Sequence, residues 1–103
     1  MLRKALPTNI GGFLPYLKDL TLYDNMFQGH IPASLGNASG LELVDLSYNN
    51  FTGQVPQSIG NLSALTSLAL AKTNLSGTIE GWTGNLKGLH WLDLQSNSFT
   101  GPI

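Results

Sequence analysis

Aliphatic residues recur along this chain with a period of 24 residues, and polar positions alternate with them inside each period. Each unit opens with an aliphatic residue, places a second one three positions later and a third two positions after that. The three columns read Leu17, Leu41, Leu65 and Leu89; Leu20, Val44, Leu68 and Leu92; and Leu22, Leu46, Leu70 and Leu94. Self-similarity at a fixed period of this size is typical of a solenoid, in which each repeat is one supersecondary unit.

The second half of each unit keeps the same register. Its columns read Asn25, Asn49, Thr73 and Asn97; Phe27, Phe51, Leu75 and Phe99; Gly29, Gly53, Gly77 and Gly101; and Ile31, Val55, Ile79 and Ile103. We expect the glycines to stand where the backbone bends and a Cβ would obstruct it. Pro32 and Pro56 follow in two units, and they should bound a second extended stretch because proline cannot donate to a strand ladder.

Alternation within each unit predicts a short strand. Leu20 and Leu22 point to one side, and Thr21 and Tyr23 point to the other, as the period of two in a strand requires. Stacked units pair these strands into a parallel sheet with a spacing of about 4.8 Å. The aliphatic columns then fill a continuous core that no single unit closes alone.

The period divides residues 1–103 into one array of repeats. It predicts a partial repeat over residues 1–16, full repeats over 17–40, 41–64 and 65–88, and a partial repeat over 89–103. Because both ends fall inside a repeat, we expect a fragment of a longer array. Such a small core has little net stability, so the isolated chain should be marginally stable, associate end to end or need neighbouring repeats.

Composition excludes several function classes. Five basic and six acidic residues leave a formal charge of −1, which argues against electrostatic capture of nucleic acid or of an anionic membrane. The chain contains no cysteine, which excludes disulfides, thiolate metal sites and a cysteine nucleophile. No aliphatic run is long enough to cross a bilayer, and the first residues show no secretory signal.

The consensus of the units, L-x-x-L-x-L-x-x-N-x-(L/F)-x-G-x-(I/V)-P-x-x-(L/I)-G-N, resembles the plant-specific leucine-rich repeat over essentially the whole chain. Segments such as Ile31–Ser39 and Asn50–Gly53 most resemble the extracellular arrays of plant receptor-like kinases, particularly the rice blight-resistance type. The resemblance implies an α/β solenoid. In this leucine-rich-repeat superhelix a short-stranded parallel sheet forms the concave face, and irregular or 3-10 segments form the convex side.

The asparagine column predicts a hydrogen-bonded ladder. Behind each strand the backbone turns out of the sheet and leaves amides inside the coil, and asparagine offers both a carbonyl and an amide to them. We expect Asn25, Asn49 and Asn97 to bond the turns above and below, and Thr73 to do only part of this.

The unit over residues 65–88 is the least regular. Thr73 stands in the asparagine column and Glu80 in the proline column. Thr83, next to Trp82, should place a hydroxyl in the aliphatic column of the convex side. Solenoids tolerate individual weak repeats, so we interpret these changes as sequence drift rather than as a functional feature.

Outward strand positions vary between units while the core columns do not, which marks the concave face as the binding surface. Outward columns also include Ser47, Ala69 and Ala71, which we expect to be free of packing. Tyr23, Tyr48 and Trp91 are candidate anchors because aromatic side chains dominate interface energetics, although Trp91 could instead only cover its neighbours. The candidate ligand-binding residues are Asp19, Tyr23, Asp45, Tyr48, Lys72, His90, Trp91 and Asp93.

Four sequons predict surface asparagines that can carry glycans in a secretory pathway. The tripeptides begin at Asn37, Asn50, Asn61 and Asn74. The repeat itself favours asparagine at these places, so the sequons are partly a by-product of the fold.

No arrangement for catalysis, cofactor or metal is predicted. Asp45 and Asp93 share a column two strands apart, about 10 Å, which is too far for a carboxylate pair in glycoside hydrolysis. His30 and His90 lie in different columns more than two repeats apart, so they do not form a metal site. Neither a glycine-rich phosphate loop nor the signatures of a protein kinase are found.

The expected function is therefore non-catalytic binding. The resemblance implies a fragment of a plant receptor-like kinase or receptor-like protein ectodomain, which senses a peptide or protein and contacts another leucine-rich-repeat ectodomain. It also implies a location outside the plasma membrane or in the cell wall, with no insertion of this segment into the membrane. Two alternatives are a free-standing wall protein similar to inhibitors of pectin-degrading enzymes, and a truncated gene product without activity of its own.

Overall fold

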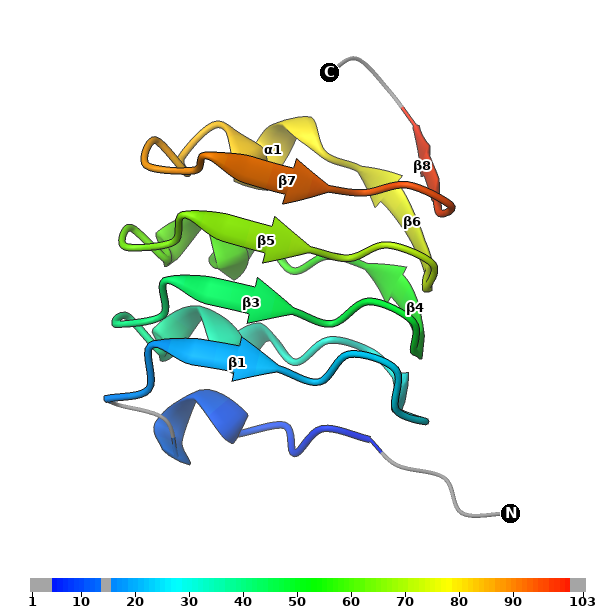
Figure 1. Ribbon diagram of the computed structural model, residues 1–103, viewed down its shortest axis with the longest axis horizontal. Coiled ribbons are helices and arrows are strands. Elements are labelled where there is room, and N and C mark those ends of the chain that lie inside the picture. The colour runs from blue at the N-terminus through cyan, green and yellow to red at the C-terminus, as the bar shows by residue number, and fades with distance from the viewer. Residues whose placement is uncertain (1–4, 14–15, 101–103) are drawn as a thin grey trace.

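Two parallel sheets and a row of short helical segments form the three sides of the solenoid (Figure 1). The computed structural model describes residues 5–13 and 16–100, except the side chains of Phe13 and Glu80. In each repeat the chain passes through a strand of the first sheet, a strand of the second sheet and then a helical segment. Successive repeats stack, so that equivalent elements lie next to one another.

The first sheet is formed by the strands that the alternation predicts. They are β1 (Asp19–Thr21), β3 (Leu43–Asp45), β5 (Ser67–Ala69) and β7 (Trp91–Asp93). All pairs are parallel and in the order β1-β3-β5-β7, and Leu20, Val44, Leu68 and Leu92 are in register. The sheet therefore repeats the period of the sequence, and its inner face supplies the central columns of the core.

A second parallel sheet continues each repeat on the adjoining side. Its strands are β2 (Gln28–Gly29), β4 (Asn50–Gln54), β6 (Asn74–Thr78) and β8 (Ser98–Thr100), in the order β2-β4-β6-β8. The pairing is offset from the repeat, so that Thr52 lies opposite Asn74 and Ser76 opposite Ser98. Gly53 and Gly77 have φ values of 81° and 87°, a region that favours glycine, which accounts for their recurrence in these strands.

Short helical segments form the convex side. Three are 3-10 helices, η1 (Ile10–Phe13), η2 (Ala33–Asn37) and η3 (Gln57–Asn61), and one is the α-helix α1 (Glu80–Thr83). Pro32 and Pro56 precede η2 and η3 in extended conformations. A Cβ at Gly36 would collide with the carbonyl group of Ser58, so this glycine allows neighbouring helical segments to approach closely.

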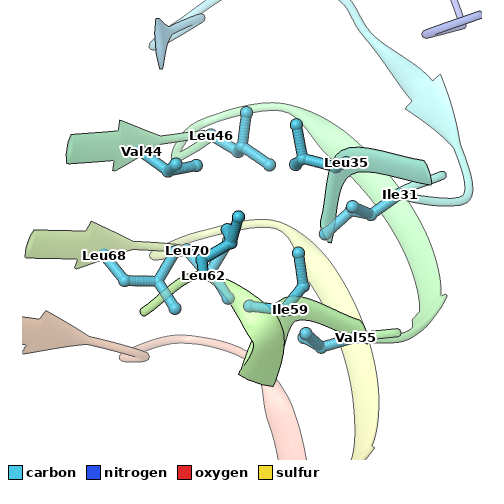
Figure 2. A pocket seen from close by; sticks show the side chains of 9 residues that line it. All are labelled: Ile31, Leu35, Val44, Leu46, Val55, Ile59, Leu62, Leu68 and Leu70. Carbon is cyan, nitrogen blue, oxygen red and sulfur yellow. The ribbon is translucent and has the colours of Figure 1, made fainter. Parts of the chain in front are cut away.

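The core is mainly aliphatic and continuous through the central repeats. Leu35, Leu62 and Leu65 are fully buried, as is Phe51, whose ring stacks on that of Phe27 with the ring centroids 6.2 Å apart. A cavity of about 10 Å³ remains in the core, where three successive repeats meet (Figure 2). It is lined by Ile31, Leu35, Val44, Leu46, Val55, Ile59, Leu62, Leu68 and Leu70. Because this lining is entirely aliphatic, the cavity is a packing gap in the core rather than a ligand site.

The irregular third repeat differs from the expected arrangement. Trp82 is 0% exposed and belongs to the core, whereas Thr83 is partly exposed and its hydroxyl donates to the carbonyl of Ile79 at 2.6 Å. A residue before proline avoids the α region, but Ile79 precedes Glu80 and adopts a right-handed helical conformation. The helical segment therefore starts earlier in this repeat, and Trp82 rather than Thr83 enters the core.

Candidate functional site

The candidate binding surface is the outer face of the first sheet, the concave sheet of the leucine-rich-repeat fold. Strand alternation directs Leu20 into the core and leaves Asp19 and Thr21 exposed on β1. The same alternation presents Trp91 and Asp93 on β7. Tyr23, Tyr48 and Lys72 lie where the chain leaves the strands, and all three are exposed.

Three of the predicted residues form a continuous row across successive repeats. The ring centroids of Tyr23 and Tyr48 are 4.9 Å apart at an interplanar angle of 54°. The Nζ atom of Lys72 lies 5.2 Å from the centroid of the Tyr48 ring, within the range of a cation–π interaction. Tyr48 therefore lies between a second aromatic ring and a cation. We call these three residues the Tyr–Tyr–Lys row.

Backbone geometry fixes the position of two members of this row. Tyr48 and Lys72 have φ values of 60° and 52°, and the equivalent Asp24 and Ser96 have 57° and 59°. Residues other than glycine adopt this left-handed region infrequently, and for a bulky side chain it is strained. Its recurrence in four repeats shows that the turn after each strand imposes it, whichever side chain stands there.

His90 and Trp91 lie at the opposite ends of the strands and are not joined to the Tyr–Tyr–Lys row by any contact within the described residues. Trp91 is 54% exposed at the start of β7. The Nδ1 atom of His90 is 2.7 Å from the carbonyl oxygen of Gly88, which anchors the ring against its own loop. The predicted site therefore has two separate parts, an aromatic row after the strands and an indole before them.

The predicted carboxylates have different surroundings. Asp45 accepts a hydrogen bond from the backbone N–H of Ser47 at 3.0 Å, and Asp93 accepts one from that of Gln95 at 3.2 Å. These two residues brace the ends of their own strands, and Ala69 lies between them in register. Asp19 is exposed and makes no hydrogen bond or ion pair within the described part of the chain.

Three outward positions are not available to a ligand, contrary to the expectation from their columns. Ala69 and Ala71 are 3% and 2% exposed, and Ser47 is also buried. The hydroxyl of Ser47 accepts a hydrogen bond from the backbone N–H of Ala71 at 2.9 Å, so it links two repeats. Single methyl and hydroxymethyl groups are covered by the longer side chains around them, which alternation alone does not reveal.

The asparagine column bonds its own repeat and the preceding one, rather than the turns above and below. Asn49 donates from Nδ2 to the carbonyls of Leu22, Leu46 and Ser47, and its Oδ1 accepts from the backbone N–H of Phe27. The Leu22 bond is 2.8 Å and crosses to the previous repeat. Asn25 is exposed and, within the described residues, donates only to carbonyls of its own repeat.

The C-terminal end of the asparagine column shows which hydrogen bonds are lost where threonine replaces asparagine. Asn97 donates to the carbonyl of Leu70 in the preceding repeat at 2.6 Å, and its Oδ1 accepts from the Leu75 N–H. The hydroxyl of Thr73 lies 2.6 Å from the same oxygen of Asn97 and 3.3 Å from the carbonyl of Leu70. It has one proton and contacts no turn of the preceding repeat in the described structure, so this junction lacks the asparagine bonds.

The four sequon asparagines are exposed, and none lies on the first sheet. Asn37 and Asn61 end η2 and η3, and Asn50 and Asn74 begin β4 and β6. Glycans at these positions would cover the convex side and the second sheet while leaving the concave face open.

Histidine and carboxylate side chains of the described residues do not come together in a group of three that could hold a metal ion. No helix in the same residues has the length and apolar character needed to cross a bilayer. What the concave face offers is aromatic area, exposed hydrogen-bonding groups and a few charges.

A second exposed surface was not predicted as a site from the sequence. The outer face of the second sheet presents uncharged residues, among them Thr52 and Thr78. In the sequence, this surface corresponds to the recurrent Asn-(F/L)-(S/T)-Gly segment. Its glycine interrupts the alternation that would otherwise predict a strand.

Comparisons with known proteins agree with this architecture. The chain matches a leucine rich repeat family model over residues 39–99 and a second one over residues 16–38. Receptor-like protein 13 of Arabidopsis thaliana is 46% identical over 41 residues, which cover 40% of this chain and 4% of that protein.

Three solved structures show the same fold. The ectodomain of the receptor kinase SOBIR1 from Arabidopsis thaliana superposes with a TM-score of 0.89 and 34% identity, over 96% of this chain and 53% of that chain. A plant ice-binding protein gives a TM-score of 0.88 and 32% identity over 97% and 32% of the two chains. The Arabidopsis receptor kinase HAESA, in complex with the peptide hormone IDA and the co-receptor SERK1, gives 0.68 and 31% over 99% and 21%.

This chain spans about half or less of the length of each of these relatives. Both family models fall on the periodic columns that form the two sheets and the core. The chain belongs to the leucine-rich repeat family, and its repeats resemble those of plant receptor ectodomains.

Proposed function

We propose that this chain is a non-catalytic binding module that recognises a peptide or protein through the outer face of its first sheet. The observation that carries the proposal is the Tyr–Tyr–Lys row. Tyr23 and Tyr48 are 52% and 38% exposed although their rings contact each other. Large aromatic side chains that remain exposed and are held in place by their neighbours are the groups that dominate binding interfaces.

Pre-organisation supports this assignment. The left-handed backbone at Tyr48 and Lys72, and the contact between the Lys72 ammonium and the Tyr48 ring, restrict both side chains before a ligand arrives. A ligand then loses less free energy to the ordering of its receptor. Trp91 and the exposed carboxylate of Asp19 extend the same face.

The relatives support the class of ligand and the location. HAESA was solved with the peptide hormone IDA and the co-receptor SERK1, and its fold includes the arrangement seen in this chain. By analogy, we place the module outside the plasma membrane or in the cell wall, with a peptide or another leucine-rich-repeat ectodomain as its partner. The proposed residues for direct contact are Asp19, Tyr23, Tyr48, Lys72, His90 and Trp91, whereas Asp45 and Asp93 act through the strand ends that they brace.

A peptide selection tests the proposal without knowledge of the natural ligand. Random peptides displayed on phage are selected on the immobilised full chain, and the best peptide is measured by calorimetry. Tyr48→Ala should weaken its binding by about thirtyfold, the cost of losing an interface anchor. Thr78→Ala on the second sheet is the matched exposed control and should leave the affinity unchanged. Equal affinity for Tyr48→Ala and Trp91→Ala as for the unmodified chain would remove the assignment to the concave face.

A second candidate function is binding to ice. One of the solved structures similar to this chain is a plant ice-binding protein, and the observation that favours it here is the uncharged outer face of the second sheet. Inhibition of ice recrystallisation by the chain, measured against an equal concentration of serum albumin, tests this candidate directly.

A further inference from the structure

We propose that the outer face of the second sheet is a surface for ice, which deepens the second candidate function and rests on it. The face consists of the outward side chains of β2, β4, β6 and β8. Its residues are Gln28, Asn50, Thr52, Gln54, Asn74, Ser76, Thr78, Ser98 and Thr100. We call this set the neutral face.

Charge separates the neutral face from the first sheet. Every member of the neutral face carries an uncharged amide or hydroxyl, whereas the first sheet presents Asp19, Asp45 and Asp93. Ice exposes only neutral O–H groups at fixed positions. A charged group must keep its own hydration shell and is costly to place against such a lattice, whereas amides and hydroxyls exchange water bonds for lattice bonds.

The strands hold these groups in a regular array. Thr52 lies opposite Asn74, Gln54 opposite Ser76, and Thr78 opposite Thr100. Parallel strands lie about 4.8 Å apart, so the hydroxyls and amides repeat at one spacing across the face. A small ligand would contact only one or a few of these positions, whereas a crystalline surface contacts all of them at once.

The array is supported from below. Phe51 and Leu75 are fully buried beneath β4 and β6, and the strands are paired on both sides in the centre of the sheet. The hydroxyls of Ser76 and Thr100 lie 3.4 Å from the carbonyl oxygens of Gly53 and Gly77 on the preceding strands, contacts that orient them across the sheet. These supports keep the face ordered before binding.

Several neutral groups are available to an outside partner. Thr52 and Thr78 are exposed, and their hydroxyls make no hydrogen bond to another described residue. The outward positions of β4 and β6 carry no aromatic side chain, and the imidazole of His30 lies against Gly53 at one edge of the face, so the face lacks the row of stacking platforms that suits a sugar chain. Ice is therefore the occupant that we choose over a neutral polysaccharide.

The sequons at Asn50 and Asn74 lie on this face. Glycans there would stand between the array and an ice surface. The full chain is therefore produced in bacteria, which leave these asparagines unmodified, and its inhibition of ice recrystallisation is compared with that of two paired variants. The experiment measures the lowest concentration that keeps ice grains small, and circular dichroism verifies that each variant is folded.

Thr52→Lys with Thr78→Lys places two charges in the neutral face. The control pair places two charges on the side of the first sheet, with Thr21→Lys in β1 and Thr66→Lys immediately before β5, where the Thr66 hydroxyl donates to the Glu42 carbonyl. The neutral-face pair should raise the required concentration by at least about tenfold, and the first-sheet pair should leave it unchanged. If the neutral-face pair does not fold, Thr78→Lys alone takes its place.

Three results would overturn the proposal in different ways. If the unmodified chain does not inhibit recrystallisation, both the candidate function and this face assignment are wrong. If only the first-sheet pair loses activity, ice binding stands and the assignment to the neutral face is wrong. If the unmodified chain adsorbs to cellulose powder but not to ice, and the neutral-face pair abolishes that adsorption, the occupant is a polysaccharide.

Discussion

The repeats over residues 41–64 and 65–88 carry the same fold with different residues in their key columns. The first has Asn49, Pro56 and Ile59, and the second has Thr73, Glu80 and Thr83 at the equivalent places. In the first, Asn49 ties two turns together and η3 buries Ile59. In the second, the helical segment becomes α1 and buries Trp82 one position earlier.

This difference shows where the solenoid is tolerant. A helical segment can change its type because its hydrogen bonds are local, as in the bond from Thr83 N–H to the Ile79 carbonyl. A strand of the first sheet cannot shift in this way, because it pairs with both neighbours in register. Compensation in the convex segment has limits, since the Nε1 of Trp82 is buried with no hydrogen-bond partner in the described residues.

The largest expected effect comes from Trp82, the residue that fills the core in the irregular repeat over residues 65–88. Trp82→Ala removes a fully buried indole and should lower the free energy of unfolding by about 3–5 kcal/mol. Urea denaturation followed by circular dichroism measures this change. Trp91→Ala is the matched control, since that indole is 54% exposed and should cost little. If both tryptophans gave equal losses, Trp82 would not be the core residue of this repeat.

The second largest effect tests the hydrogen bonds by which Asn49 joins its repeat to the preceding one. Asn49→Ala leaves the turn carbonyls of Leu22, Leu46 and Ser47 without their amide donor and should cost about 1–3 kcal/mol. Asn25→Ala removes bonds within one exposed repeat and should cost clearly less. An unchanged urea midpoint for Asn49→Ala would mean that the ladder does not stabilise the stack.

Substitutions at two glycines compare how closely neighbouring helical segments pack on the convex side. A Cβ at Gly36 would collide with the Ser58 carbonyl, and one at Gly60 would lie 3.0 Å from the Trp82 carbonyl oxygen. Gly36→Ala should therefore lower the free energy of unfolding by about 1–2 kcal/mol, and Gly60→Ala should lower it by less. Thermal melting of the two variants beside Gly12→Ala, where nothing lies within 4 Å, measures the order. The reverse order would show that the α1 junction is the tighter of the two.

The smallest effect is a gain. Thr73→Asn restores a side chain that can donate to the Leu46 carbonyl as Asn49 donates to Leu22, and it should stabilise the chain by about 0.5–1 kcal/mol. Thr21→Asn, on the exposed face of β1, is the neutral control. A loss of stability on Thr73→Asn would indicate that the irregular repeat has settled into a geometry that excludes asparagine.

Columns of like residues were predictable, and departures from them were not. The period places Leu20, Val44 and Leu68 in register, and the structure has them there. The earlier start of α1 depends on the conformation of Ile79, which the missing proline releases but the pattern of residues does not specify. The second extended stretch before Pro32 and Pro56 was predicted, but its pairing into a second sheet was not, because glycine at positive φ interrupts the alternation and the pairing is offset from the repeat.

The candidate site was predictable as a face and not as a set of contacts. Columns place Tyr48 and Lys72 next to each other, but Tyr23 stands in a neighbouring column and reaches Tyr48 only through ring orientation. Burial of Ala69 and Ala71 depends on the height of the side chains around them, which no column records. Identity of the outward residues is therefore a guide to function only after their neighbours are known.

We infer that the inward-facing side chains stabilise the solenoid, and we propose that the Tyr–Tyr–Lys row on the concave face binds the ligand. An amide NMR titration of the full chain with the selected peptide tests it most directly. We expect the largest shifts at the amides of Tyr23, Tyr48 and Lys72, and no shifts at Thr52 and Thr78 on the neutral face. Shifts confined to the second sheet or to the helical segments would contradict it.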